Sequence, residues 1–97
     1  MAKLRQFAES RPQDPFPHYA LALEHRNAGD HGEAVRVFAA LMDAHPGYVP
    51  TYLHAGHALI AAGQPDEARV VWLRGLEVAR EKGDHHAAGE LEGVLAG

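Results

Sequence analysis

Histidine is the side chain of this sequence best suited to chemistry, because imidazole binds metals and exchanges protons near neutral pH. The chain has 8 histidines. His54 and His57 lie one helical turn apart, a spacing at which two imidazoles can share a metal ion. A metal site needs further ligands, and the sequence has no cysteine and no third ligand at a diagnostic spacing. We therefore expect no metal site, with most histidines on the surface and His18 and His25 at the edge of the core.

Nucleophilic catalysis finds little support in the sequence. Serine occurs once, at Ser10, and there is no Gly-x-Ser-x-Gly turn and no phosphate-binding glycine loop. Glu24 adjoins His25, but consecutive helical residues point in different directions and do not form an acid–base pair. Because an activity must be argued from a site, we expect that the protein is not an enzyme and carries no cofactor.

Composition narrows the class of protein further. A chain of 97 residues with 46% hydrophobic side chains suits one globular domain. Its net charge of −4 argues against binding of nucleic acid, because a nucleic-acid-binding protein would show a basic patch. No apolar stretch has the length of a membrane span, and charged residues interrupt the first ten, unlike a signal peptide. The lack of cysteine fits the cytoplasm, where we expect the protein to reside.

The chain matches itself when it is shifted by 34 residues. The coinciding pairs are Gly29 and Gly63, Glu33 and Glu67, Ala34 and Ala68, and Phe38 and Trp72. A fixed period of this length indicates one small unit that is repeated and stacked. Stacked units form extended surfaces, which suit the binding of other chains better than catalysis.

Apolar residues at helical spacing, broken by glycine and proline, predict six helices with short connections and antiparallel neighbours. Asp14, Asp30 and Asp84 are the expected N-caps, and Gly29 is expected to end its helix in the left-handed conformation. The expected helices cover residues 1–13, 15–28, 31–45, 50–62, 65–82 and 84–97.

The recurring residues resemble the tetratricopeptide repeat (TPR) family. In the first full unit the matching residues are Leu21, Ala22, His25, Gly29, Asp30, Glu33, Ala34, Phe38, Leu41 and Pro46. In the second they are Tyr52, Ala55, Gly56, Leu59, Gly63, Glu67, Ala68, Trp72, Gly75 and Leu76. The resemblance implies an all-α, right-handed superhelical stack of antiparallel helix pairs, a TPR-like α-solenoid. It also implies a non-catalytic module for protein–protein interaction.

We expect a single TPR-like domain over residues 1–97. Residues 1–13 form an N-terminal half-unit helix, 15–48 the first repeat, 49–82 the second repeat and 84–97 a C-terminal capping helix. Arg80 stands where the first unit has Pro46, so the fifth helix is expected to run on by a turn. The shift of 34 places Glu90 where the earlier units have Ala22 and Gly56, which suits a last helix with a polar outer face.

In a TPR-like stack, the first helix of each pair lines a concave face. On this side the sequence places large apolar residues, which usually mark a binding surface. We predict that the face binds a peptide or an amphipathic helix of a protein partner, unless neighbouring first helices bury the stripe themselves. The chaperone-tail clamp of some TPR domains is not matched here. The predicted partner-binding residues are Phe16, Tyr19, Leu23, Arg26, Asn27, Leu53, His57 and Ile60, with Arg26, Asn27 and His57 as polar anchors.

A self-assembling scaffold is the alternative function. Residues 1–13 carry a net charge of +2, and residues 84–97 carry −3. Ends of opposite sign can dock head to tail, which would give a homo-oligomer joined through the end helices. Exposed ion pairs contribute little, so the same ends also suit solvated caps.

We predict that a zinc titration leaves the melting temperature unchanged, because no third ligand accompanies His54 and His57. Thermal unfolding with and without stoichiometric zinc measures this. A rise of several degrees would contradict the prediction.

Overall fold

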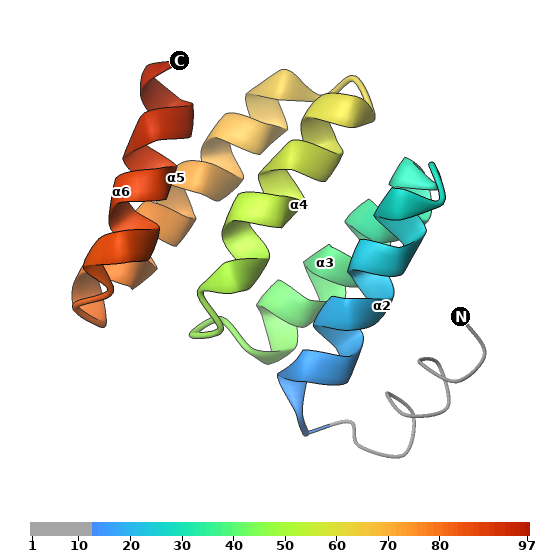
Figure 1. Cartoon of the computed structure of the whole chain (residues 1–97), viewed down its shortest axis with the longest axis horizontal. Coiled ribbons are helices and arrows are strands. Elements are labelled where there is room, and N and C mark those ends of the chain that lie inside the picture. The colour runs from blue at the N-terminus through green and yellow to red at the C-terminus, as the bar shows by residue number, and fades with distance from the viewer. Residues whose placement is uncertain (1–12) are drawn as a thin grey trace.

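The computed structural model describes residues 13–97 as five α-helices without a strand, so the all-α prediction is confirmed for this part of the chain (Figure 1). The sixth helix, expected over residues 1–13, lies outside the described residues apart from Gln13. Within residues 13–97, every helix is too short or too polar to cross a membrane. The helices are α2 (Pro15–Asn27), α3 (His31–Ala44), α4 (Pro50–Ala61), α5 (Pro65–Glu81) and α6 (His85–Ala96).

Local sequence signals set the ends of these helices. Each expected aspartate cap accepts a hydrogen bond from a backbone N–H in the first turn, and a proline opens α2, α4 and α5. Gly29 has a φ of +81°, as predicted, and Gly63 and Gly83 take the same left-handed conformation. The expected turns are therefore confirmed at these positions.

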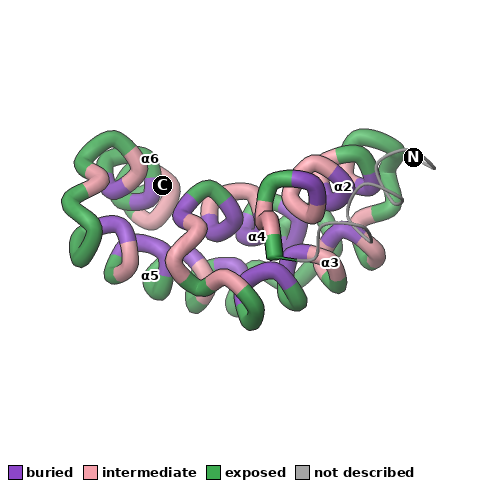
Figure 2. Tube along the Cα trace, turned by 90° about the horizontal axis from the view of Figure 1, so that it is seen from below, coloured by how far each residue is buried: buried purple, intermediate pink, exposed green. Residues whose placement is uncertain are grey.

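The helices form a shallow arc in which consecutive helices pack against each other (Figure 2). Helices α2, α4 and α6 line its inner side, and α3 and α5 line its outer side. α4 also touches both α2 and α6. The inner side, the concave face, is therefore formed by three helices.

Helices α4 and α5 pack closely at two glycine positions. The indole of Trp72 lies against Gly56, and the ring of Tyr52 lies against Gly75, where an added Cβ would overlap each ring. Trp72 Nε1 also donates a hydrogen bond to the carbonyl of Leu53 over 3.1 Å, tying α5 to α4. The large aromatic residues thus fill space that only glycine leaves open.

Helix α6 sits two residues out of the expected register. The buried residues of α4 include Tyr52 and Ala55, and a shift of 34 would bury His86 and Gly89 in α6. The structure buries Ala88 and Leu91 instead. Helix α5 has 17 residues against 14 in α3, since Arg80 lets it continue beyond the position of Pro46, as predicted. The expected match of Glu90 to Ala22 and Gly56 is therefore wrong.

We predict opposite effects for two glycine-to-alanine substitutions. In Gly56→Ala the new methyl group meets the Trp72 indole, so we expect a loss of about 1–3 kcal/mol of unfolding free energy. In Gly89→Ala the methyl group meets open space, so we expect a gain of up to about 1 kcal/mol from helix propensity.

Urea unfolding followed by circular dichroism measures both effects. Equal stability changes in the two variants would show that Gly56 is not a packing position.

Candidate functional site

A polar junction joins α2 to α4 on the concave face. Arg26 Nη1 lies 2.7 Å from Nδ1 of His54. Because a guanidinium only donates, Nδ1 accepts, and the imidazole is neutral with its proton on Nε2. Arg26 Nη2 also lies 3.5 Å from Oδ1 of Asn27, a weak contact. Two predicted anchors, Arg26 and Asn27, are therefore together, with His54 as an additional partner.

An aromatic cluster lies beside this junction. The Tyr19 ring meets the rings of Tyr48 and His54 edge to face, at 5.7 Å between centroids in both cases. Burial raises the pKa of Tyr19, and the nearby Tyr48 raises it further. Burial also raises the pKa of Tyr48. Both hydroxyls are neutral at physiological pH and can donate a hydrogen bond.

The electrostatics of His54 agree with its neutral form. Burial lowers the pKa of His54, and the charges of Arg26 and His57 lower it further. Glu90 acts in the opposite direction on the pKa, so its carboxylate is within electrostatic reach of His54. The hydrogen-bond geometry and the pKa direction therefore support the same protonation state.

A hollow of about 240 Å³ lies between α4 and α6. Its apolar lining is Val49, Pro50, Leu53, Ala87 and Leu91. Its polar lining is His54, Asp84, His86 and Glu90. On α6, Glu90 Oε1 lies 3.1 Å from Nε2 of His86. Predicted site residue Leu53 thus lies in an apolar depression next to the Arg26–His54 junction.

The remaining predicted residues do not join this group. Phe16 is exposed in the first turn of α2, and Ile60 is exposed in the last turn of α4, at the other end of the face. Leu23 is half-buried and packs against the core. His57 is exposed, and its ring packs against Trp72 with 5.4 Å between centroids. The predicted set therefore divides into Tyr19, Arg26, Asn27 and Leu53 at the centre and these four around it.

Sequence reasoning missed Tyr48, His54 and Glu90 as parts of the concave face. Tyr48 lies in the α3–α4 connection, where no helical periodicity assigns a residue to a face. A period of 34 aligns Glu90 with Ala22 and Gly56 and places it on the polar outer face of a capping helix, away from the concave face. The sequence does carry a signal for the shift of α6, because position 80 has arginine where the first unit has Pro46.

The described residues give no support to a metal site. Residues 13–97 hold no group of three or more His, Cys, Asp or Glu side chains that could ligate one ion. His54 uses Nδ1 for Arg26, and His57 packs against Trp72. The two imidazoles that suggested a shared ion therefore have separate partners.

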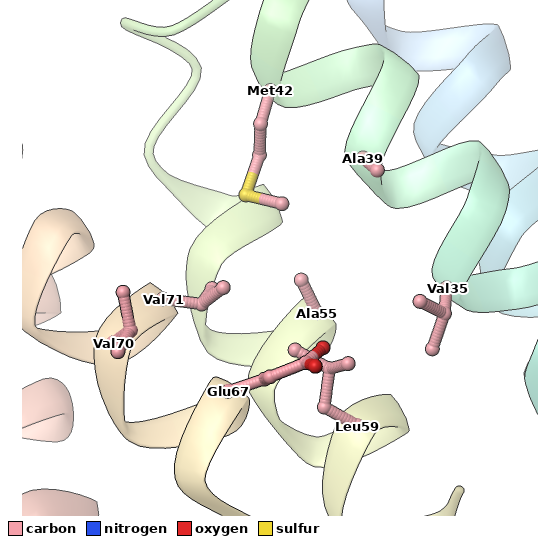
Figure 3. Close-up of a pocket in the computed structure, with 8 residues that line it drawn as sticks. All are labelled: Val35, Ala39, Met42, Ala55, Leu59, Glu67, Val70 and Val71. Atoms are coloured by element: carbon pink, nitrogen blue, oxygen red, sulfur yellow. The ribbon is translucent and has the colours of Figure 1, made fainter. Parts of the chain in front are cut away.

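A second, mostly apolar hollow of about 280 Å³ opens between α3 and α5 over α4 (Figure 3). Figure 3 shows Glu67 as the charged residue among its labelled lining, with Val35 and Met42 on α3 and Leu59 on α4. The concave face, in contrast, gathers cationic, imidazole and carboxylate groups around its hollow. Such convergent polar groups are what orients a ligand, so the concave face is the better candidate.

Comparisons with known proteins agree with this architecture. The sequence profile of the tetratricopeptide repeat family matches residues 26–91. The crystal structure of a tetratricopeptide repeat domain protein from Salinibacter ruber is 36% identical, with a TM-score of 0.80, and the match covers 86% of this chain and 92% of that one. The solution NMR structure of a tetratricopeptide repeat domain protein from the same organism is 36% identical, with a TM-score of 0.82, covering 88% of this chain and 86% of that one.

None of the curated proteins matches the chain significantly. The family profile covers more than half of the sequence. Both Salinibacter ruber structures are of tetratricopeptide repeat domains, and this chain shares their fold and 36% of its residues with them. The resemblance seen in the sequence is confirmed, and the chain belongs to the tetratricopeptide repeat family.

Proposed function

We propose that the concave face binds a segment of a protein partner. Tetratricopeptide repeat domains are generally non-catalytic modules for protein–protein interaction, and this chain belongs to that family. The observation that carries the proposal is the cluster of Tyr19, Arg26 and His54, which joins α2 to α4 beside the hollow at Leu53. Aromatic and arginine side chains next to an apolar depression are typical anchors of interfaces.

The cluster is held in place before a partner arrives. Arg26 is held by its hydrogen bond to His54, and Tyr19 is held by two ring contacts. Side chains that are already ordered lose little conformational entropy on binding, which favours affinity. The guanidinium has further N–H donors that can reach a carboxylate or carbonyl of the partner.

The proposed contact surface has a centre and a periphery. Tyr19, Arg26, Asn27 and Leu53 form the centre, since they adjoin the junction and the hollow. The outer contacts are proposed for Phe16, Leu23, His57 and Ile60. End-to-end self-assembly, the alternative, would pair residues 1–13 with residues 84–97 through their opposite charges.

We expect the double substitution Tyr19→Ala with Leu53→Ala to weaken capture of the partner by about tenfold or more, because anchors of this kind contribute above 1 kcal/mol each. Both side chains are half-buried, so the stack should remain folded. Affinity capture from native lysate with quantitative mass spectrometry measures the loss, and circular dichroism checks the fold.

The matched control is Val70→Ala with Leu73→Ala on α5. These side chains are 65% and 50% exposed and lie on an outer helix. Unchanged capture by the Tyr19/Leu53 variant, or an equal loss in the control, would place the site elsewhere.

The Arg26–His54 junction also predicts a pH dependence of stability. The folded protein holds the pKa of His54 below its ordinary value of about 6.5, so the unfolded chain takes up the proton first as pH falls. The stability that neutral His54 contributes is therefore present above about pH 6.5 and is lost as pH falls from there toward the folded pKa. Protonated His54 would also face the cation of Arg26.

The variant His54→Asn tests this dependence, because an amide oxygen can accept from Arg26 without titrating. Thermal unfolding at about pH 7.5 and about pH 5.5 should show a smaller acid-induced loss in the variant than in the parent chain. Equal losses in both proteins would separate His54 from the pH dependence.

A further inference from the structure

The concave face carries opposite charges on neighbouring helices. Arg26 of α2 donates a hydrogen bond to His54 of α4, so the positive charge of Arg26 lies at the boundary between these two helices. Glu90 of α6 lines the hollow on its other side, together with Asp84. The charge on the concave face is therefore positive at α2 and negative at α6, and the apolar lining of the hollow lies between the two.

The register of α6 sets the spacing between these charges. With the two-residue correction, Glu90 occupies on α6 the position that His54 occupies on α4. Helices in contact lie about 8–10 Å apart, and α4 touches α6. The axes of the helices that carry His54 and Glu90 are therefore about 10 Å apart, a length that about three to four residues of an extended chain cover.

The hollow between the charges fits one apolar side chain. It measures about 240 Å³ and is floored by Val49, Leu53 and Leu91. An aliphatic or aromatic side chain that enters it leaves water for an apolar surface, which is favourable. Side chains of an extended segment share a face at every second residue, so the residues two before and two after the inserted one point toward the charged groups at the two edges of the hollow.

The acidic edge favours a cation over other groups. Glu90 has a side chain that is 48% exposed, and its partner His86 is 89% exposed, so this pair is weakly held. Asp84 adds a second carboxylate to the same hollow, although one of its oxygens caps α6. A lysine or arginine of the partner can approach both carboxylates from solvent.

We infer that the partner segment is extended and reads acidic, apolar, basic at every second position, over about five residues. The acidic group pairs with Arg26, the apolar side chain fills the hollow at Leu53, and the basic group pairs with Glu90. This inference rests on the proposed function and specifies the chemistry of the bound segment.

Selection of a random peptide display library against the full chain tests this order. We expect the selected peptides to carry Asp or Glu about four residues from Lys or Arg, with an apolar residue midway between them. Their binding should be lost in the Tyr19→Ala, Leu53→Ala variant.

Charge reversal assigns each end of the peptide. For a selected peptide measured by fluorescence polarisation, Glu90→Lys should weaken binding by about tenfold or more, since it replaces an attraction by a repulsion. A peptide whose basic residue is changed to glutamate should recover affinity for Glu90→Lys. Arg26→Glu, with Arg26→Gln as a milder second variant, should show the same behaviour for the acidic residue. Glu77→Lys on α5 is the matched control and should bind like the parent chain.

The outcomes separate the two proposals. Peptides that need Tyr19 and Leu53 but show no charge order, or that bind Glu90→Lys as well as the parent, would overturn this inference and leave the binding face intact. Selected helical peptides without an extended acidic–basic motif would do the same. A selection whose peptides ignore Tyr19 and Leu53, or that enriches no peptide, would overturn the binding face and this inference together.

Discussion

The fold depends on close approach between helices at positions where a side chain is small. Trp72 occupies the space over Gly56, and Tyr52 occupies the space over Gly75. Each aromatic ring thereby lies against the backbone of the facing helix, and the indole N–H of Trp72 donates to the carbonyl of Leu53. Since proteins are packed at near-crystalline density, these contacts fix the distance between neighbouring helices as well as stabilising them.

These contacts position α4 against α5, and α4 is the central helix of the concave face. With α3 and α5 as the outer layer, α2, α4 and α6 lie side by side and present their outward stripes to the same space (Figure 2). Arg26 can meet His54 across this boundary only because its helices are held at contact distance. The polar junction is thus a consequence of apolar packing elsewhere, and a change at Gly56 would be felt on the face through the position of α4.

The sequence predicted the elements that follow from local and periodic signals. Aspartate caps, opening prolines and the left-handed Gly29 act within a few residues, so the described helix ends fall close to their expected places. The register of α6 was mispredicted because it depends on the length of α5, which varies once Pro46 has no counterpart at residue 80. Tyr48 was missed because loop residues have no helical period, and His54 because its partner lies on another helix.

A repeat protein can specify a partner only at positions that its packing leaves free. Gly56 leaves room for the Trp72 indole, and Ala22, at the equivalent position, is fully buried in the same core cluster as Phe38. Two residues before Ala22 and Gly56 stand Ala20 in α2 and His54 in α4. With the corrected register, Glu90 is their counterpart in α6, so three residues of different chemistry occupy this position. None of the three is fully buried, so the packing of the core does not determine which side chain stands there. The repeat therefore supplies the spacing of the charges, and the departures from the repeat supply their signs.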